Sequence, residues 1–388
     1  MNRRDLLRAM AIAGAAAPFL QLRAAQQNKY LVLVELKGAN DGLNTLVPYE
    51  SDNYRKLRRR IGVKASEVID LGYTSQEGAL GLNNSMSALE PSIGHDVALI
   101  TGVGYPNQNR SHFKSIALWE TGGDGNRGAQ KGWVTETLER LYAPADHPVL
   151  GATLQGSMGL FARGEGVYIS MARLNQLADI EVDEKPPTNN RLLNLISKRK
   201  TDLSQASKIL EAELERYSAS RLPTRMPYGD LGGQLTDVMR VIGADLGVPV
   251  MHVQHGSFDT HEGQPWRHPR LLKDLAENLA AFRQGLQRMG RWDDVLVMTY
   301  SEFGRRAGEN GNEGTDHGSA NTHFMMGGQV NGGLYGEHPS LKRLVDGDME
   351  HTLDYRAIYD QVCQNWFGDS AQPWSGYRDD ALKGLLQS

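Results

Sequence analysis

Six potential metal ligands lie close together in this chain of 388 residues. His255, Asp259 and His261 belong to one short stretch rich in Gly and Ser, and Asp316 and His317 belong to another. The sixth residue, Glu302, lies between the two stretches. Imidazole and carboxylate groups are the usual ligands of Zn, Mn or Mg in hydrolytic sites. Eight of the eleven histidines fall between His252 and His351, so we expect the chemistry in this part of the chain. The pattern predicts a divalent metal site.

The roles of individual ligands remain open at this stage. The first stretch spaces its ligands by four and two residues, so they converge only on irregular backbone, which its glycines favour. Glu302 either binds the metal or positions His255 or His261 through a hydrogen bond. Asp316-His317 either belongs to the site or forms a surface turn.

A second group of candidates could act on a substrate. Ser111 stands at the expected start of a helix, where it either caps the helix or serves as a metal-activated nucleophile. The preceding Arg110 could neutralise an oxyanion. Asp41 follows a buried strand and is either an Asx-turn residue or a metal ligand. The candidates for substrate binding are Asn40, Asn109 and Arg305, and a solvated basic turn is the alternative for the arginine.

Strand and helix patterns alternate along the chain. Near-continuous aliphatic runs predict strands at residues 29–37, 97–101, 248–254, 295–300 and 323–326. Helical periodicity predicts helices at residues 111–119, 191–217, 231–246, 269–289 and 354–366. The alternation predicts an α/β fold with a mostly parallel central sheet sandwiched by helices. Residues 26–388 are expected to form one domain, with an insertion or lid at 149–190.

This fold would bring the candidate residues to one place. In an open α/β sheet, ligands bind beyond the carboxyl ends of the strands. Asp41, His255 and Glu302 each follow a predicted strand. Asp316 and His317 precede one, in a long loop that could fold over the same edge. The sequence therefore predicts that distant residues converge on one crevice.

The first 25 residues predict export from the cytoplasm. Asn2-Arg-Arg-Asp-Leu-Leu7 resembles a twin-arginine motif, and an apolar run too short for a permanent membrane span follows it. We expect the twin-arginine translocase to be a partner during export, and the mature protein to act in the periplasm or outside the cell. The net charge of -4 argues against nucleic-acid binding. The single cysteine, Cys363, excludes an intramolecular disulfide and a thiolate metal cluster.

Several motifs together resemble a bacterial family of exported proteins of unknown function. They are the leader, Gly38-Ala-Asn-Asp41, Asn109-Arg-Ser-His112, His255 to His261, Ser301-Glu-Phe-Gly-Arg305 and Asp316-His317. That family is grouped with the alkaline phosphatase and sulfatase superfamily. The resemblance implies an alkaline-phosphatase-like sandwich with one or two divalent metals. It also implies that Asp41 binds metal, that Ser111 is the nucleophile, and that Asp259, His261 and Asp316-His317 complete the site.

The chain departs from the superfamily in three ways. Ser301-Glu302 stands where alkaline phosphatases carry Asp-His after the strand, and Asp316-His317 comes fourteen residues later. Asp259-Thr-His261 replaces an Asp-x-x-x-His pair. Formylglycine sulfatases modify a cysteine in a Cys-x-Pro-x-Arg motif, whereas the only cysteine here lies in a late helical pattern.

Three functions follow from these observations. The first is a metal-dependent hydrolase of phosphate or related anionic esters, small or polymeric, with Zn as the expected ion and Mn or Mg as alternatives. The second is a non-catalytic binding or scaffolding protein on a hydrolase-like fold, motivated by the altered ligand spacing. The third is a metal-dependent enzyme acting on a sugar or peptidoglycan-type polymer.

Overall fold

A nine-stranded sheet forms the centre of the molecule. The computed structural model describes residues 29–124, 131–143, 147, 149–171, 201 and 217–387. The strand order is β11-β5-β10-β9-β1-β8-β6-β7, and β14 also pairs with β5. Only β10 runs antiparallel to its neighbours, so the predicted mostly parallel sheet is confirmed. The strands are β1 (Tyr30–Leu36), β5 (Val97–Gly104), β6 (Gly151–Leu154), β7 (Tyr168–Met171), β8 (Val250–His255), β9 (Val295–Tyr300), β10 (Asn321–Gly327), β11 (Gly333–Tyr335) and β14 (Leu353–Asp354).

Strand β1 shows why the sheet has helices on both faces. All seven of its residues are buried, and successive side chains point to opposite faces. Val32 and Val34 join the hydrophobic core on one face, and Leu31 and Leu33 join the core on the other. A strand that is apolar on both faces must be packed against other elements on both faces, so the predicted helices on either side of the sheet are required.

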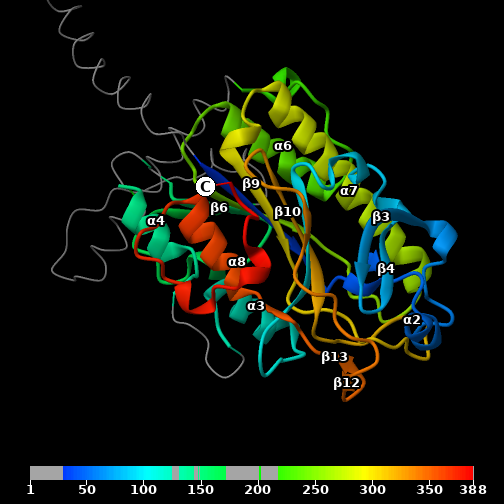
Figure 1. The fold of residues 1–388 in the computed structure, drawn as a ribbon. Helices are drawn as coiled ribbons and strands as arrows, with labels where there is room; N and C mark the ends of the chain where they lie inside the picture. The colour runs from blue at the N-terminus through cyan, green and yellow to red at the C-terminus, as the bar shows by residue number, and fades with distance from the viewer. Residues whose placement is uncertain are drawn as a thin grey trace, which may run out of the picture.

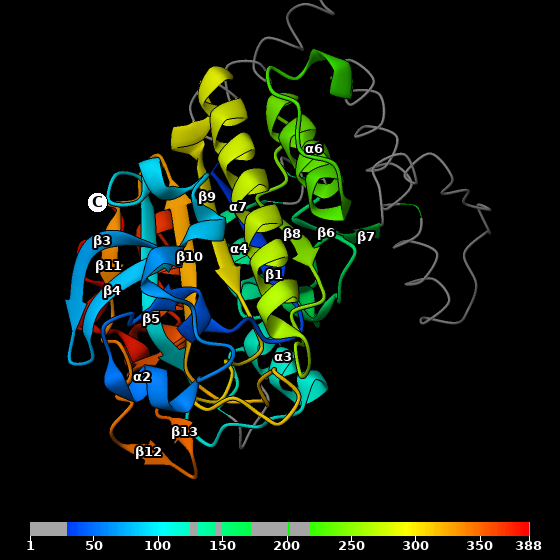
Figure 2. The same cartoon turned by 90° about the vertical axis from the view of Figure 1, so that its right-hand side faces the viewer.

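Helices form the two outer layers (Figures 1 and 2). Helices α6 (Asp230–Gly243) and α7 (Gln264–Arg288) cover one face. Helices α3 (His112–Thr121), α4 (Thr135–Leu141) and α8 (Arg356–Asp360) cover the other, and α8 continues as a π-helical segment, Gln361–Trp366. Among the described residues, no helix is both long and apolar enough to cross a membrane.

The direction of β10 brings its preceding loop to the carboxyl edge of the sheet. Strands β1, β8 and β9 are mutually parallel and end at this edge, whereas the antiparallel β10 begins there. The loops after β1, β8 and β9 and the loop before β10 therefore meet (Figure 2). This is the convergence that the sequence predicts.

Other parts of the fold differ from the sequence-based expectations. A small sheet of β2 (Leu46–Val47), β4 (Gly78–Asn83) and β3 (Val68–Ser75), helix α2 (Asp52–Leu57) and a hairpin of β12 (Leu344–Val345) and β13 (Asp348–Met349) were not predicted. Residues 149–171, expected in the insertion or lid, contribute β6 and β7 to the central sheet. Residues 172–190, the export signal and nearly all of the helix expected at 191–217 lie outside the described residues.

Helix α7 begins five residues before the expected position 269. Pro265 stands in its first turn, where a missing backbone N–H leaves no hydrogen bond unmade. Pro269 lies inside the helix, near its start. A proline that the sequence suggests as a boundary is thus accommodated within the helix.

Candidate metal centre

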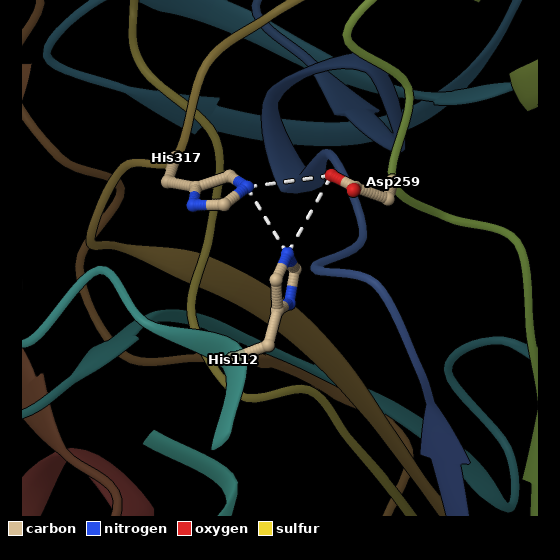
Figure 3. A group of neighbouring side chains, drawn as sticks. All are labelled: His112, Asp259 and His317. Carbon is tan, nitrogen blue, oxygen red and sulfur yellow. Dashed lines mark hydrogen bonds and ion pairs between the residues drawn. The ribbon is translucent and has the colours of Figure 1, made fainter. Parts of the chain in front are cut away.

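Three side chains from three separate loops converge at the carboxyl edge of the sheet (Figure 3). His112 is the first residue of α3, Asp259 lies in the loop after β8, and His317 lies in the loop before β10. The Nε2 atoms of His112 and His317 are 3.1 Å apart. Asp259 Oδ1 lies 3.4 Å from His317 Nε2 and 3.6 Å from His112 Nε2. The three residues form a group that could hold a metal ion.

A third imidazole borders this group. His261 Nε2 lies 2.9 Å from His317 Nε2 and 3.2 Å from Asp259 Oδ1. Asp259 and His261 reach the same place because the intervening Thr260 turns away and donates to Gln264. His261 thus contacts two members of the group, and Asp259 remains 47% exposed.

The Nδ1 atom of each imidazole contacts a hydrogen-bond acceptor. His112 Nδ1 lies 2.6 Å from Glu302 Oε1, and His261 Nδ1 lies 3.1 Å from Asp316 Oδ1. His317 Nδ1 lies 2.8 Å from the carbonyl oxygen of Arg110. A carbonyl or carboxylate oxygen accepts a hydrogen bond, so in each neutral imidazole Nδ1 carries the proton and the lone pair of Nε2 faces the cluster.

The donor set fits a divalent metal ion. Three unprotonated Nε2 atoms at these separations would repel one another unless a cation lies between them. Tetrahedral Zn with Zn–N distances of about 2.0–2.1 Å places its ligand atoms roughly 3.3–3.4 Å apart, close to the separations of 2.9–3.6 Å observed here. Nitrogen-rich ligand sets suit Zn, whereas Mg prefers oxygen.

Burial and nearby charges favour the neutral form of His317 and the ionised form of Asp259, whereas Glu302 favours the protonated form of His112. The hydrogen bond from His112 to Glu302 raises the pKa of His112, and this outweighs the opposing effect of burial. Burial lowers the pKa of His317, which favours its neutral form. Burial alone would raise the pKa of Asp259, but the hydrogen bond and charge of Arg305 outweigh it and keep the carboxylate ionised.

Arg305 ties the loops of the site together and is fully buried. Its guanidinium donates to the carbonyl oxygens of Ala39 at 2.8 Å and Thr315 at 2.9 Å. It also donates to Asp259 Oδ1 at 2.6 Å, and to the carbonyl of Gly38. The sequence suggests anion contact or a solvated turn for this residue. The structure instead gives it a supporting position behind Asp259.

Asp41 lies outside the cluster, although the sequence suggests it as a ligand. Its carboxylate is fully buried and forms a 2.6 Å ion pair with Arg58. It also accepts a hydrogen bond from Gln264 and caps the short 3-10 helix Gly42–Asn44. These partners commit the carboxylate to the fold.

Asn40 and His255 are likewise placed in the supporting structure. Asn40 Oδ1 lies 2.9 Å from His268 Nε2, and its backbone N–H donates to Ser301 Oγ at 3.0 Å. His255 Nε2 lies 3.1 Å from the carbonyl oxygen of Leu271 in α7. Neither side chain contacts the metal cluster.

The segment before α3 is connected to the cluster through its backbone. Ser111 occupies the N-cap position, but its hydroxyl makes no capping hydrogen bond. Its backbone N–H donates to Asn109 Oδ1 at 2.9 Å. The Arg110 carbonyl contacts His317, while its half-exposed guanidinium pairs with Asp348 at 3.0 Å. The Ser111 hydroxyl is therefore not bonded to the helix end, and the residue directly precedes the candidate ligand His112.

His112 is the candidate ligand that the sequence reasoning missed. The residue lies in the motif that supplied Asn109, Arg110 and Ser111. Its position directly after a predicted N-cap, at the carboxyl edge of the sheet, is the signal that could have identified it. Glu302 was expected to bind the metal or to position His255 or His261, and its carboxylate contacts His112 Nδ1 instead.

The chain is similar to several solved structures at low sequence identity. A protein of the alkaline phosphatase superfamily from Vibrio parahaemolyticus is 9% identical, with 91% of this chain and 70% of that chain covered and a TM-score of 0.41. The C-terminal periplasmic domain of EcEptC from Escherichia coli, in complex with Zn, is 9% identical, with 94% and 89% covered and a TM-score of 0.41. The PsFucS1 sulfatase from Pseudoalteromonas sp. is 11% identical, with 98% and 76% covered and a TM-score of 0.41.

Sequence comparison identifies the family. None of the curated protein sequences matches the chain. Residues 28–365 match the model of a family described as a protein of unknown function, DUF1501. This match spans most of the chain, including every residue of the cluster. The chain belongs to the DUF1501 family.

Proposed function

We propose that this protein binds Zn at His112, Asp259, His261 and His317 and hydrolyses phosphate or related anionic esters. One observation carries the proposal. In each of the three histidines, Nδ1 contacts a carboxylate or carbonyl oxygen and Nε2 faces the other side chains of the cluster. Histidines that ligate metals are commonly oriented in this way by a carboxylate or carbonyl group. An ion bound there would act as a Lewis acid on an ester oxygen.

We assign Ser111 as the nucleophile, with water as the alternative. The Ser111 hydroxyl is not used to cap α3, and the residue directly precedes His112. The N-terminus of α3 favours negative charge, which would stabilise the deprotonated hydroxyl. Arg110 is half-exposed beside this position, and releasing Asp348 would free it for an anionic ester.

A metal-binding protein without catalysis is the second candidate. Both arginines that the sequence assigned to anion contact are occupied: Arg305 is buried, and Arg110 is paired with Asp348. In this arrangement neither guanidinium is available to an anionic ester, which supports a binding role.

Metal content is the first test. Elemental analysis and calorimetric titration with Zn should give one ion per chain for the wild-type protein. His317→Ala should lower the affinity by about 100-fold or more, because it removes the ligand shared by the closest contacts. His95→Ala, at an exposed position outside the cluster, should leave the affinity unchanged. Folded wild-type protein that takes up no Zn, Mn or Mg would refute the proposal.

Activity separates the two candidates. The metal-loaded protein should hydrolyse at least one member of a panel of phosphate monoesters, phosphate diesters and sulfate esters. Ser111→Ala should abolish this activity while leaving the metal bound. Retained activity would assign the attack to water, and metal binding without any hydrolysis would favour the binding role.

We also propose export by the twin-arginine translocase. The support is the motif around Arg3 and Arg4 and the apolar run that follows it. Replacing both arginines by lysine should keep the protein in the cytoplasmic fraction of fractionated cells. Unchanged export would contradict this proposal.

A further inference from the structure

A groove of about 630 Å³ lies beside the metal cluster. One wall follows His261 directly and contains Glu262 and Trp266, and the other contains Glu313, shortly before Asp316. Hydrogen bonds join the walls, since Gln264 N–H donates to the Glu313 carbonyl at 2.9 Å.

The loop that carries the groove residues Gly311, Asn312 and Glu313 also contacts the cluster. Asn310 Nδ2 donates to the His261 carbonyl at 2.9 Å and to Asp316 Oδ1 at 3.2 Å. The groove and the cluster are therefore built from the same two loops, those that carry His261 and Asp316.

Trp266 is the unusual residue of this groove. Its side chain is 60% exposed, whereas four of the other five tryptophans are at most 5% exposed and Trp374 is partly buried. Tryptophan is usually mostly buried, because exposing its large apolar surface is unfavourable. The Arg270 guanidinium lies over the ring, 5.7 Å from its centroid, and the edge of the indole packs close to Gly263. The indole is thus held in place with much of its surface open.

The groove around Trp266 carries charges of both signs. Arg60 and Arg267 contribute guanidinium groups, and Glu262 and Glu313 contribute carboxylates. The two positive and two negative side chains cancel, so the net charge of a ligand does not decide whether the groove binds it. Hydroxyl groups both donate and accept hydrogen bonds, so neighbouring hydroxyls can use guanidinium and carboxylate groups together.

We propose that the groove binds a saccharide ring stacked on Trp266, and that the substrate is a phosphate or sulfate ester of a saccharide. The apolar C–H face of a sugar ring matches the exposed indole, and its hydroxyls match the mixed charges. The ester group would then reach the metal cluster. This inference rests on the proposed hydrolase function for the reaction, but ring binding can be measured separately.

Kinetics of the Zn-loaded protein give the first test. Glucose 6-phosphate carries a ring and glycerol 1-phosphate does not. Trp266→Ala should raise the ratio of the two KM values, that of the ring ester over that of the ringless ester, by about fivefold or more, because only the ring ester loses a stacking contact. The ratio of the two kcat values should change less than about twofold. An unchanged KM ratio would overturn the inference.

Tyr228→Ala is the matched control. Tyr228 is also an exposed aromatic residue next to an arginine, Arg225, but it lies outside the groove. This variant should leave both KM values unchanged. An equal change of the KM ratio in Tyr228→Ala and Trp266→Ala would also overturn the inference.

Equilibrium binding distinguishes failure of this inference from failure of the proposed function. Cellobiose and glucose 6-phosphate, titrated into the holoprotein, should change the tryptophan fluorescence saturably in wild type and Tyr228→Ala but not in Trp266→Ala. Such binding without ester hydrolysis would refute the hydrolase function and keep the saccharide site. Adenosine monophosphate should bind more weakly than both sugars. If it binds more tightly than both and Trp266→Ala abolishes that binding, the ligand of the groove is a nucleotide and the saccharide inference is wrong.

Discussion

At the residue scale, the partners of Nδ1 decide what the cluster can bind. An imidazole whose Nδ1–H is donated to a carboxylate is a stronger base at Nε2 and is fixed in orientation. Glu302 provides this support for His112 from a buried position, where it also accepts the backbone N–H of Gly38 at 3.0 Å. The carboxylate thus links the loop after β1 to His112 at the start of α3.

Glu302→Gln should weaken metal binding without unfolding the protein. The amide keeps the size of the side chain but removes the negative charge behind His112. We expect the affinity for Zn in calorimetric titration to fall by about 10- to 100-fold. Glu309→Gln is the control, because that carboxylate pairs with Arg60 and does not touch the histidines. Equal affinities of the two variants would show that Glu302 does not position His112.

Side-chain direction limits what the sequence can predict about single residues. Asp259, His261, Asp316 and His317 were correctly expected to lie together, because each adjoins a strand at the carboxyl edge. His255 adjoins the same edge but points to α7, since alternation along β8 places it on the face of Met251 and Val253. That direction depends on which face of the strand meets which helix, and such pairing arises from tertiary packing.

At the element scale, the site depends on loops that approach one another without intervening side chains. A Cβ atom added at Gly314 would lie 2.2 Å from the carbonyl carbon of His261. The two loops also exchange backbone hydrogen bonds, as Thr315 N–H donates to the Thr260 carbonyl at 3.1 Å. Any side chain at position 314 would therefore move the loop that carries His261.

Gly314→Ala should damage both stability and metal binding. Overpacking of this kind costs about 1–3 kcal/mol, and the displaced His261 would lose its contacts with Asp316 and His317. Urea unfolding and Zn titration measure the two effects. Gly311→Ala lies in the same loop, where an added Cβ meets nothing within 4 Å, and should be close to wild type. Two variants with equal properties would contradict the close-approach argument.

Strand positions could be predicted better than strand directions. All five predicted strands are present, because long apolar runs mark strands that are buried on both faces. The antiparallel direction of β10 has no signature in such a run. Strands β6 and β7 have four residues each and stand in a Gly-rich segment, so they lacked the length that periodicity needs. The ion pair of Asp41 with Arg58 was missed because a buried partner is set by the packed fold.

At the scale of the whole molecule, three buried histidines link stability to pH. Burial lowers the pKa of His268 to about 4, of His323 to about 3, and of His338 to about 4. In the unfolded chain a histidine has a pKa of about 6.5. Between pH 6.5 and 4 the unfolded state therefore binds more protons, and these groups make the folded state less stable as the pH falls. Three such groups would contribute a slope of about 4 kcal/mol per pH unit near pH 5.

His323→Leu isolates one of these groups. Both ring nitrogens of His323 are buried without a hydrogen-bond partner, so leucine should stabilise the protein by about 1 kcal/mol at pH 7. At pH 5 the advantage should grow by about 2 kcal/mol, because the variant has one fewer group that binds a proton only when unfolded. Urea unfolding at pH 7, 6 and 5, without added metal, measures the difference. Phe324→Leu, on the same strand, removes no titratable group, so its effect should be the same at each pH. A His323→Leu difference that is also constant would show that His323 takes up its proton in the folded protein over the same pH range as in the unfolded chain.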